Sequence, residues 1–115
     1  MARGRYNVIW MPAAEGDLAA IQDFIGQDRP AVAQGIVESL RVKASTLTTY
    51  PLRGRCVPEL QGRTGHSYRE LICPPWRLIY RVHARVVIVL GVIDSRRKIE
   101  DVLRERLARS EGVPP

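Results

Sequence analysis

The chain has 115 residues and a mass of 13.0 kDa, which allows one domain with a single hydrophobic core and excludes two. Its hydrophobic content of 45% excludes a disordered protein, and its net charge of +6 favours a polyanionic or acidic partner. No apolar run approaches the length of a membrane span, and the N-terminus lacks the apolar core of a signal peptide, so we expect a cytoplasmic protein with no membrane partner.

The first predicted elements are a strand and a helical hairpin. Side chains alternate from Arg5 to Trp10, which predicts a strand that pairs with strands later in the chain. Apolar residues then recur at helical spacing from Pro12 to Gly26 and again from Ala33 to Leu47, with Asp28 as the expected N-cap of the second helix. A link this short allows only an antiparallel hairpin, whose apolar stripes should pack on one face of a sheet.

A meander of three antiparallel strands is predicted between Tyr68 and Ile93, and Pro74 and Pro75 end the first strand because they cannot donate to a ladder. In the second strand the side chains alternate between an apolar face and a face that carries Arg77 and Arg81, which we expect to be open. The third strand is apolar at nearly every position, as is typical of a central strand covered on both faces.

A last amphipathic helix is predicted after the meander, with Arg96 and Arg97 in its first turn. Residues 110–115 are expected to fray as a C-terminal tail. The predicted fold class is therefore α+β, with an N-terminal strand, an antiparallel helical hairpin, a three- to four-stranded antiparallel meander and a C-terminal helix in one domain of residues 1–109.

The cysteine and histidine residues form no pattern of metal ligands. Cys56 and Cys73 are the only cysteines, and neither His66 nor His83 has further ligands at a suitable spacing. We expect two free, buried or half-buried thiols, a solvated His66, no metal and no cofactor.

Several short segments occur together at spacings that identify a family more specifically than any one of them. They are the strand ending at Trp10, the spacing of Ala14, Leu18 and Ile21, the segments Tyr68-Arg69-Glu70-Leu71 and Trp76–Val82, and the closing Val92-Ile93-Asp94-Ser95-Arg96-Arg97. This set resembles the RelE/ParE superfamily of bacterial toxins from type II toxin–antitoxin pairs. The resemblance implies that fold, a toxin that arrests growth, and a cognate antitoxin with which it forms a hetero-oligomer.

RelE-like members are ribosome-dependent endoribonucleases that cut mRNA, and such an enzyme needs a base, an acid and cations around the phosphate. The resemblance assigns the cations to Arg77 and to Arg96 or Arg97, and Glu70 could serve as the base. However, Tyr68 and Glu70 stand where those relatives have lysines, and Val102 stands near the position of their late aromatic residue. The enzymatic reading is therefore the alternative, because the proton donor is missing.

ParE-like members poison DNA gyrase, which requires a basic surface on a rigid scaffold and no acid–base pair. The resemblance favours this branch, and it predicts a non-enzymatic toxin. The residues assigned to target or antitoxin binding are Arg69, Arg77, Arg81, Arg96 and Arg97. A free outer strand and a basic face would also suit the acidic tail of an antitoxin.

Structural roles stay open for some of these arginines. Arg69 could face the helices and pair with Asp17 or Glu15, and Arg81 could be solvated or pair with Asp94. A third hypothesis from a different class is a basic module that binds nucleic acid with a steep salt dependence and does not arrest growth.

Overall fold

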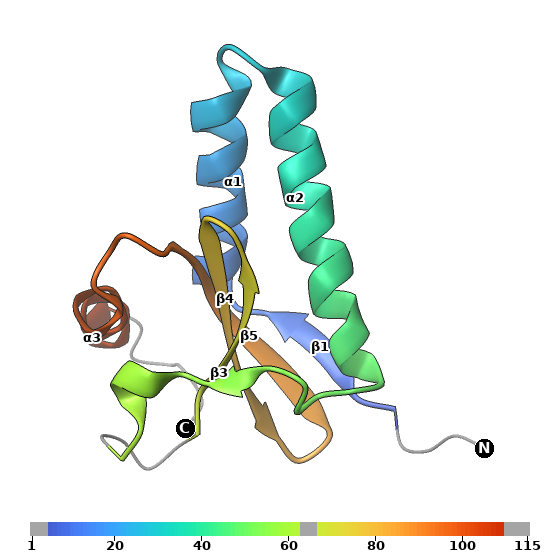
Figure 1. Ribbon diagram of the computed structural model, residues 1–115, viewed down its shortest axis with the longest axis vertical. Coiled ribbons are helices and arrows are strands. Elements are labelled where there is room, and N and C mark those ends of the chain that lie inside the picture. The colour runs from blue at the N-terminus through green and yellow to red at the C-terminus, as the bar shows by residue number, and fades with distance from the viewer. Residues whose placement is uncertain (1–4, 63–66, 110–115) are drawn as a thin grey trace.

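The computed structural model describes residues 5–62 and 67–109, in which a helical hairpin packs on one face of a five-stranded sheet (Figure 1). The predictions for His66 and for residues 110–115 lie outside this part of the chain. The elements in chain order are β1 (Asn7–Trp10), α1 (Pro12–Gly26), α2 (Pro30–Ser45), the 3₁₀ turn η1 (Thr46–Thr48), β2 (Arg55–Cys56), the 3₁₀ turn η2 (Pro58–Leu60), β3 (Arg69–Cys73), β4 (Trp76–His83), β5 (Val86–Asp94) and α3 (Ile99–Arg109). The predicted α+β class is confirmed.

The helical hairpin of α1 and α2 is confirmed, and each helix begins with a proline, at Pro12 and Pro30, where a missing N–H costs nothing. The predicted cap is wrong, because Arg29 rather than Asp28 precedes α2 and no side chain caps it. The hairpin buries Ala14, Leu18, Ile21, Leu40 and Ala44 against the sheet, and Leu47 of η1 joins the same core. None of the helices in the described part of the chain is long and apolar enough to cross a bilayer.

The sheet has the strand order β1-β5-β4-β3-β2, so β3, β4 and β5 form the predicted meander and β2 extends it by a fourth strand. All of these neighbours are antiparallel, whereas β1 pairs with β5 in parallel, from Asn7 opposite Val86 to Trp10 opposite Val89. The sequence predicted this pairing but not its direction. Two parallel strands need a long connection between them. The connection from β1 to β5 contains the helical hairpin and the other three strands of the sheet.

One residue of β5 has no opposite residue on β4. The register passes from Ile79 opposite Gly91 to Tyr80 opposite Val89, which leaves Leu90 as the extra residue of a bulge. The extra residue reverses the alternation of β5, so valines on both sides of it reach the hairpin core. Ile93 and Leu90 of the same strand pack in a second apolar cluster on the other face, so the prediction that this strand is covered on both faces is confirmed.

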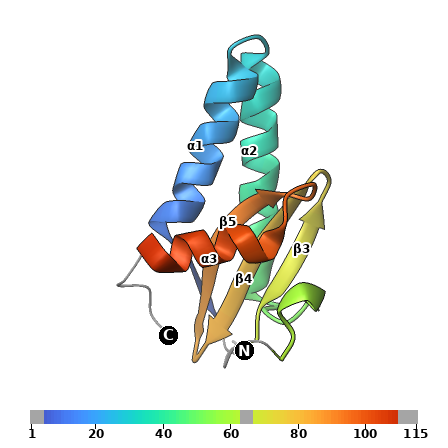
Figure 2. The same cartoon turned by 90° about the vertical axis from the view of Figure 1, so that its left-hand side faces the viewer.

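The second face of the sheet is covered by α3 and η2, and Figure 2 shows α3 running across the strands. A second apolar cluster fills this layer and consists of Val57, Leu60, Ile79, Ile93, Ile99 and Val102. The expectation of an open basic face is therefore wrong, because α3 folds back over it. Arg77 is only 7% exposed and Arg81 only 5%.

Candidate functional site

An ion-pair network on the α3 side of the sheet contains two of the predicted site residues, Glu70 and Arg77. Arg77 on β4 donates from Nε to Glu70 on β3 at 2.6 Å, and from Nη1 and Nη2 to Glu59 of η2 at 2.9 and 2.8 Å. Arg55 on β2 donates from Nε to the second oxygen of Glu70 at 2.6 Å. The network therefore ties β2, η2, β3 and β4 together.

This geometry makes Glu70 a poor general base. Its side chain is 0% exposed, and each of its oxygens accepts from a guanidinium group. A general base has to come within hydrogen-bond reach of the proton that it removes, and a substrate hydroxyl has no such access here. Arg77 is likewise turned toward the two carboxylates and away from solvent.

Glu59 should make the stability of the protein sensitive to acid. Hydrogen bonds from Arg77 lower the pKa of Glu59 to about 2 from its ordinary value of 4.5. A carboxyl with a lowered folded-state pKa stabilises the protein above the unfolded pKa, and this contribution is lost as the pH falls through the folded pKa. We expect Glu59→Gln to be less stable than the wild type near neutral pH, and the difference to shrink as the pH falls from about 4.5 to about 2. Urea denaturation across this range measures the difference, and a constant value would contradict the assignment.

Arg69 points to the opposite face of β3, toward the hairpin, as one of the alternatives predicted. Its Nη1 donates to the carbonyl oxygens of Gly54 at 2.7 Å and Leu52 at 3.3 Å. The predicted partners are wrong, because Glu15 and Asp17 each accept from another arginine. Arg69 thus fixes the loop that precedes β2.

The remaining predicted arginines lie elsewhere. Arg81 is buried on the α3 side of β4. The alternative in which Arg81 is solvated is therefore wrong. Arg96 and Arg97 are exposed, and the prediction that they lie in the first turn of the last helix is wrong, because α3 begins only at Ile99. Asp94 accepts from Nε and Nη2 of Arg96 at 2.9 and 2.6 Å, and these bonds lower the pKa of Asp94 to about 2.

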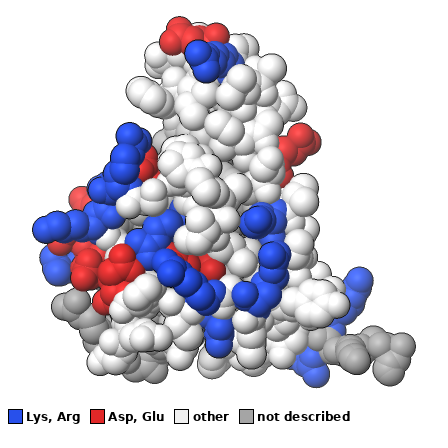
Figure 3. Space-filling model, in the orientation of Figure 1, with Lys and Arg blue, Asp and Glu red and all other residues white. Residues whose placement is uncertain are grey.

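The predicted arginines therefore do not form one cluster. The alternation of the strands places Arg69 on the hairpin side of the sheet, and Arg77 and Arg81 on the α3 side. Arg96 and Arg97 lie beyond the end of β5. Figure 3 shows that, on the side of the molecule in view, Lys and Arg lie mostly over the sheet and α3, below the tip of the hairpin, with Asp and Glu among them.

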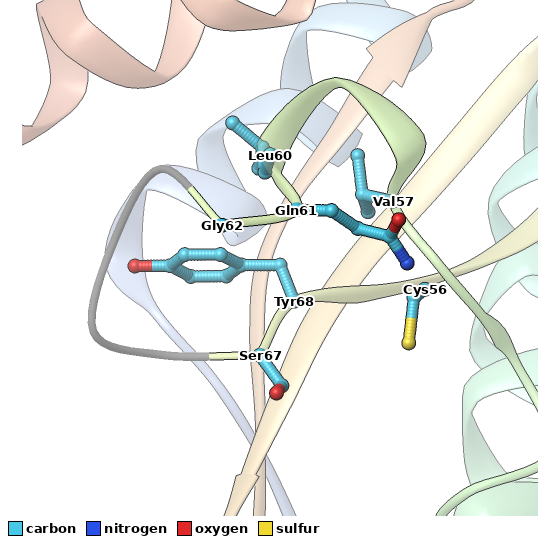
Figure 4. A pocket seen from close by; sticks show the side chains of 7 residues that line it. All are labelled: Cys56, Val57, Leu60, Gln61, Gly62, Ser67 and Tyr68. Atoms are coloured by element: carbon cyan, nitrogen blue, oxygen red, sulfur yellow. The ribbon is translucent and has the colours of Figure 1, made fainter.

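A pocket of about 280 Å³ lies beside β2 and η2, and no residue of the ion-pair network is among its described lining residues (Figure 4). Its described lining residues are Cys56, Val57, Leu60, Gln61, Gly62, Ser67 and Tyr68, and none of these is an acid, a histidine or a cation. Cys56 and Cys73 are free and half-buried, as predicted.

Comparison with known proteins identifies the family. Residues 8–99 match the family model described as the ParE toxin of type II toxin–antitoxin system, parDE. The chain belongs to the ParE toxin family. The chain is also 34% identical over 92 residues to Toxin RelE2 of Caulobacter vibrioides, covering 79% of this chain and 97% of that protein.

Two solved structures share the fold of this ParE-family chain. One is the chromosomal ParDE toxin–antitoxin system from P. aeruginosa, with a TM-score of 0.66, 20% identity, and coverage of 79% of this chain and 97% of that one. The other is the toxin–antitoxin complex RelBE2 from Mycobacterium tuberculosis, with a TM-score of 0.52, 23% identity, and coverage of 78% and 98%. The family match and the relative with 34% identity confirm the superfamily inferred from the sequence.

The match to the ParE family ends at the first residue of α3, and one of the contacts that sequence reasoning missed lies beyond it. Arg106 on α3 donates from Nη1 and Nη2 to Asp17 on α1 at 2.8 and 2.5 Å, and Asp17 also accepts from the backbone N–H of Val92 at 2.7 Å. This contact fixes α3 to the hairpin beside the bulge of β5. No local pattern in the sequence signals a pair so far apart.

Proposed function

We propose that this ParE-family toxin arrests growth by poisoning DNA gyrase, without cutting RNA, and that a cognate antitoxin protein neutralises it in a hetero-oligomeric complex. The observation that carries the proposal is the ion-pair network in which the buried side chains of Glu70 and Arg77 pair with each other and with Arg55 and Glu59. It occupies the carboxylate and the strand arginine that an endoribonuclease would use. Poisoning an enzyme by binding needs a rigid basic surface and no proton transfer.

The antitoxin partner is supported by the two structural neighbours, which are described as a ParDE system and a RelBE2 toxin–antitoxin complex. The net charge of +6 favours an acidic partner segment. Arg96 and Arg97 are our proposed contacts with the target or the antitoxin, because both are exposed at the end of the sheet.

The second candidate function is that of a ribosome-dependent mRNA endoribonuclease. The observation that favours it is the name of the relative with 34% identity, Toxin RelE2. The two candidates predict different products, since a gyrase poison leaves broken DNA held by gyrase and an endoribonuclease leaves cut message.

Two assays with the purified chain separate the candidates. Incubation with gyrase and supercoiled DNA should give cleaved DNA after protein denaturation, and translating ribosomes should yield uncut mRNA. Cut mRNA together with intact DNA would overturn the proposal. Growth arrest on expression should be relieved by co-expression of the neighbouring reading frame.

The proposed contacts are tested in the same gyrase assay. We expect Arg96→Ala combined with Arg97→Ala to lower the potency of cleavage about tenfold, since each removes an exposed cation from the interface. The matched control is Arg29→Ala combined with Arg104→Ala, which removes two cations that are exposed elsewhere on the molecule. Equal effects of the double variant and the control would show that Arg96 and Arg97 have no special role.

A further inference from the structure

The outer edge of β1 has main-chain groups that the sheet does not use. β1 is the last strand on its side of the sheet and pairs only with β5 (Figure 1). The N–H of Asn7 donates to the carbonyl oxygen of Arg85 at 2.9 Å, and the N–H of Met11 donates to that of Val89 at 3.0 Å. Alternate residues of a parallel strand bond to the same neighbour, so Ile9 also faces β5. The odd-numbered residues therefore hold β1 in the sheet.

The main-chain groups of Val8 and Trp10 point the other way, out of the sheet. Within the described residues, no hydrogen bond joins the N–H or C=O of either residue to another group. The edge is closed just before them, because the N–H of Tyr6 donates to the carbonyl oxygen of Thr48 in η1 at 3.0 Å. Two donors and two acceptors thus remain open along Val8 and Trp10, and an added strand binds to groups arranged in this way.

Two guanidinium groups lie on the hairpin side of β1. The rings of Tyr6 and Trp10 pack against the hairpin core. Arg85 lies over the Tyr6 ring at 5.3 Å from its centroid, and Arg41 lies over the Trp10 ring at 5.0 Å. Arg41 shares an exposed ion pair with Glu15, whereas no carboxylate in the described part of the chain pairs with Arg85. This face therefore has a cation near each end of the open stretch.

The opposite face of β1 is apolar at its centre. Ile9 points to the α3 side, because neighbouring side chains of a strand alternate, and it is 46% exposed. An added strand would also place its side chains alternately on the two faces. Those on the hairpin side would lie toward Arg41 and Arg85, and those on the other side would lie toward Ile9. The edge therefore fits a strand in which acidic and apolar residues alternate.

Nucleic acid and a second copy of the chain fit this edge less well. The C=O groups of Val8 and Trp10 need hydrogen-bond donors, and phosphate oxygens only accept. Two copies joined through β1 would bring the cations Arg41 and Arg85 of both chains together, and like charges on paired strands are destabilising. An acidic peptide in extended conformation supplies donors, acceptors and the opposite charge.

We infer that the outer edge of β1 binds an extended segment of a partner protein, with alternating acidic and apolar side chains, as a sixth strand of the sheet. The inference rests on the proposed function only for the identity of this partner, the antitoxin, and it adds where and how the partner is held. An antitoxin could neutralise the toxin from another surface, and the gyrase assay contains no peptide. Failure of the inference would therefore leave the proposed function standing.

The probe is a capped, fluorescein-labelled peptide of alternating glutamate and valine, about six residues long as is common for strands. Its binding to the full chain is measured by fluorescence anisotropy, and amide hydrogen exchange is followed by NMR with and without saturating peptide. We expect the amides of Val8 and Trp10 to exchange at least about tenfold more slowly in the complex. The amide of Ile9, which already bonds to β5, should change little. Absence of binding, or binding with unchanged exchange at Val8 and Trp10, would overturn the inference.

A pair of substitutions at Val8 tests the main-chain contact directly. Val8→Pro and Val8→Ala both truncate the packing of the side chain, but only proline removes the outward N–H, and proline is tolerated at such an edge position. We expect Val8→Pro to bind the peptide about tenfold more weakly than Val8→Ala. Thermal melting by circular dichroism checks that both variants are folded. Equal affinities of two folded variants would show that the peptide does not pair with β1.

The charge requirement has its own test. We expect Arg41→Gln combined with Arg85→Gln to weaken binding of the peptide about tenfold. The matched control is Arg29→Gln combined with Arg104→Gln, which removes the same charge from other exposed positions and should bind nearly as the wild type does. A peptide with lysine in place of glutamate should not bind. Equal losses in the two double variants, or equal binding of both peptides, would overturn the assignment of an acidic segment to this edge.

Discussion

Arg77→Ala is expected to lower the free energy of unfolding by about 3–5 kcal/mol, the range for removing one partner from a buried ion pair. The variant leaves Glu70 fully buried with Arg55 as its remaining partner, and it deprives Glu59 of both of its bonds to Arg77. Burial of the Glu70 carboxylate costs free energy, and in the variant fewer hydrogen bonds remain to compensate for that cost. Urea denaturation, followed by circular dichroism at neutral pH, measures the change.

The control for this prediction is Arg104→Ala, since Arg104 forms an ion pair with Asp101 in which the side chains are 71% and 63% exposed. An exposed pair contributes only about 0–1 kcal/mol, so this variant should unfold almost as the wild type does. Equal destabilisation by the two substitutions would contradict the buried character of the network. The result also matters for function, because lost toxicity in Arg77→Ala would then reflect lost stability.

Gly54→Ala is expected to destabilise the protein by about 3 kcal/mol, at the upper end of the range for overpacking a core. The added methyl group would meet the backbone oxygen of Glu70 at 2.5 Å, and a strand backbone cannot move aside cheaply. The hydrogen bond from Gly54 to Tyr80 would lengthen as the loop shifts.

The same substitution at Gly16 provides the matched control. A Cβ atom at Gly16, inside α1, would meet nothing within 4 Å. Alanine is favoured over glycine in a helix interior by up to about 1 kcal/mol, so Gly16→Ala should stabilise the protein. A small or stabilising effect of Gly54→Ala would show that the loop is not fixed against β3 and β4.

Local patterns in the sequence predicted most of the elements but not how their charged side chains pair. The alternation from Trp76 to Val82 correctly placed Leu78 and Tyr80 toward the hairpin and Arg77 on the other face. The same alternation said nothing about what covers that face, so Arg77 was expected in solvent. Its partners Glu59 and Glu70 come from other elements, and a pattern of period two carries no information about them.

The bulge of β5 shows a second limit of the same kind. A nearly continuous apolar run looks the same with or without an extra residue, so the position of Leu90 could not be read from the sequence. The bulge also brings the N–H of Val92 to the side chain of Asp17, which in turn holds Arg106. The position of α3 over the sheet therefore depends on contacts among three distant segments.

The sequence by itself determined the helical hairpin, the meander, the basic character and the family, because each depends on local periodicity, turn residues or an ordered set of short segments. Only the tertiary structure decided that Arg77 is buried in ion pairs and that Arg96 and Arg97 remain exposed. The physical reason is that burial and charge pairing depend on distances between segments that fold together. A guanidinium group therefore becomes structural or available for binding only when the chain around it has packed.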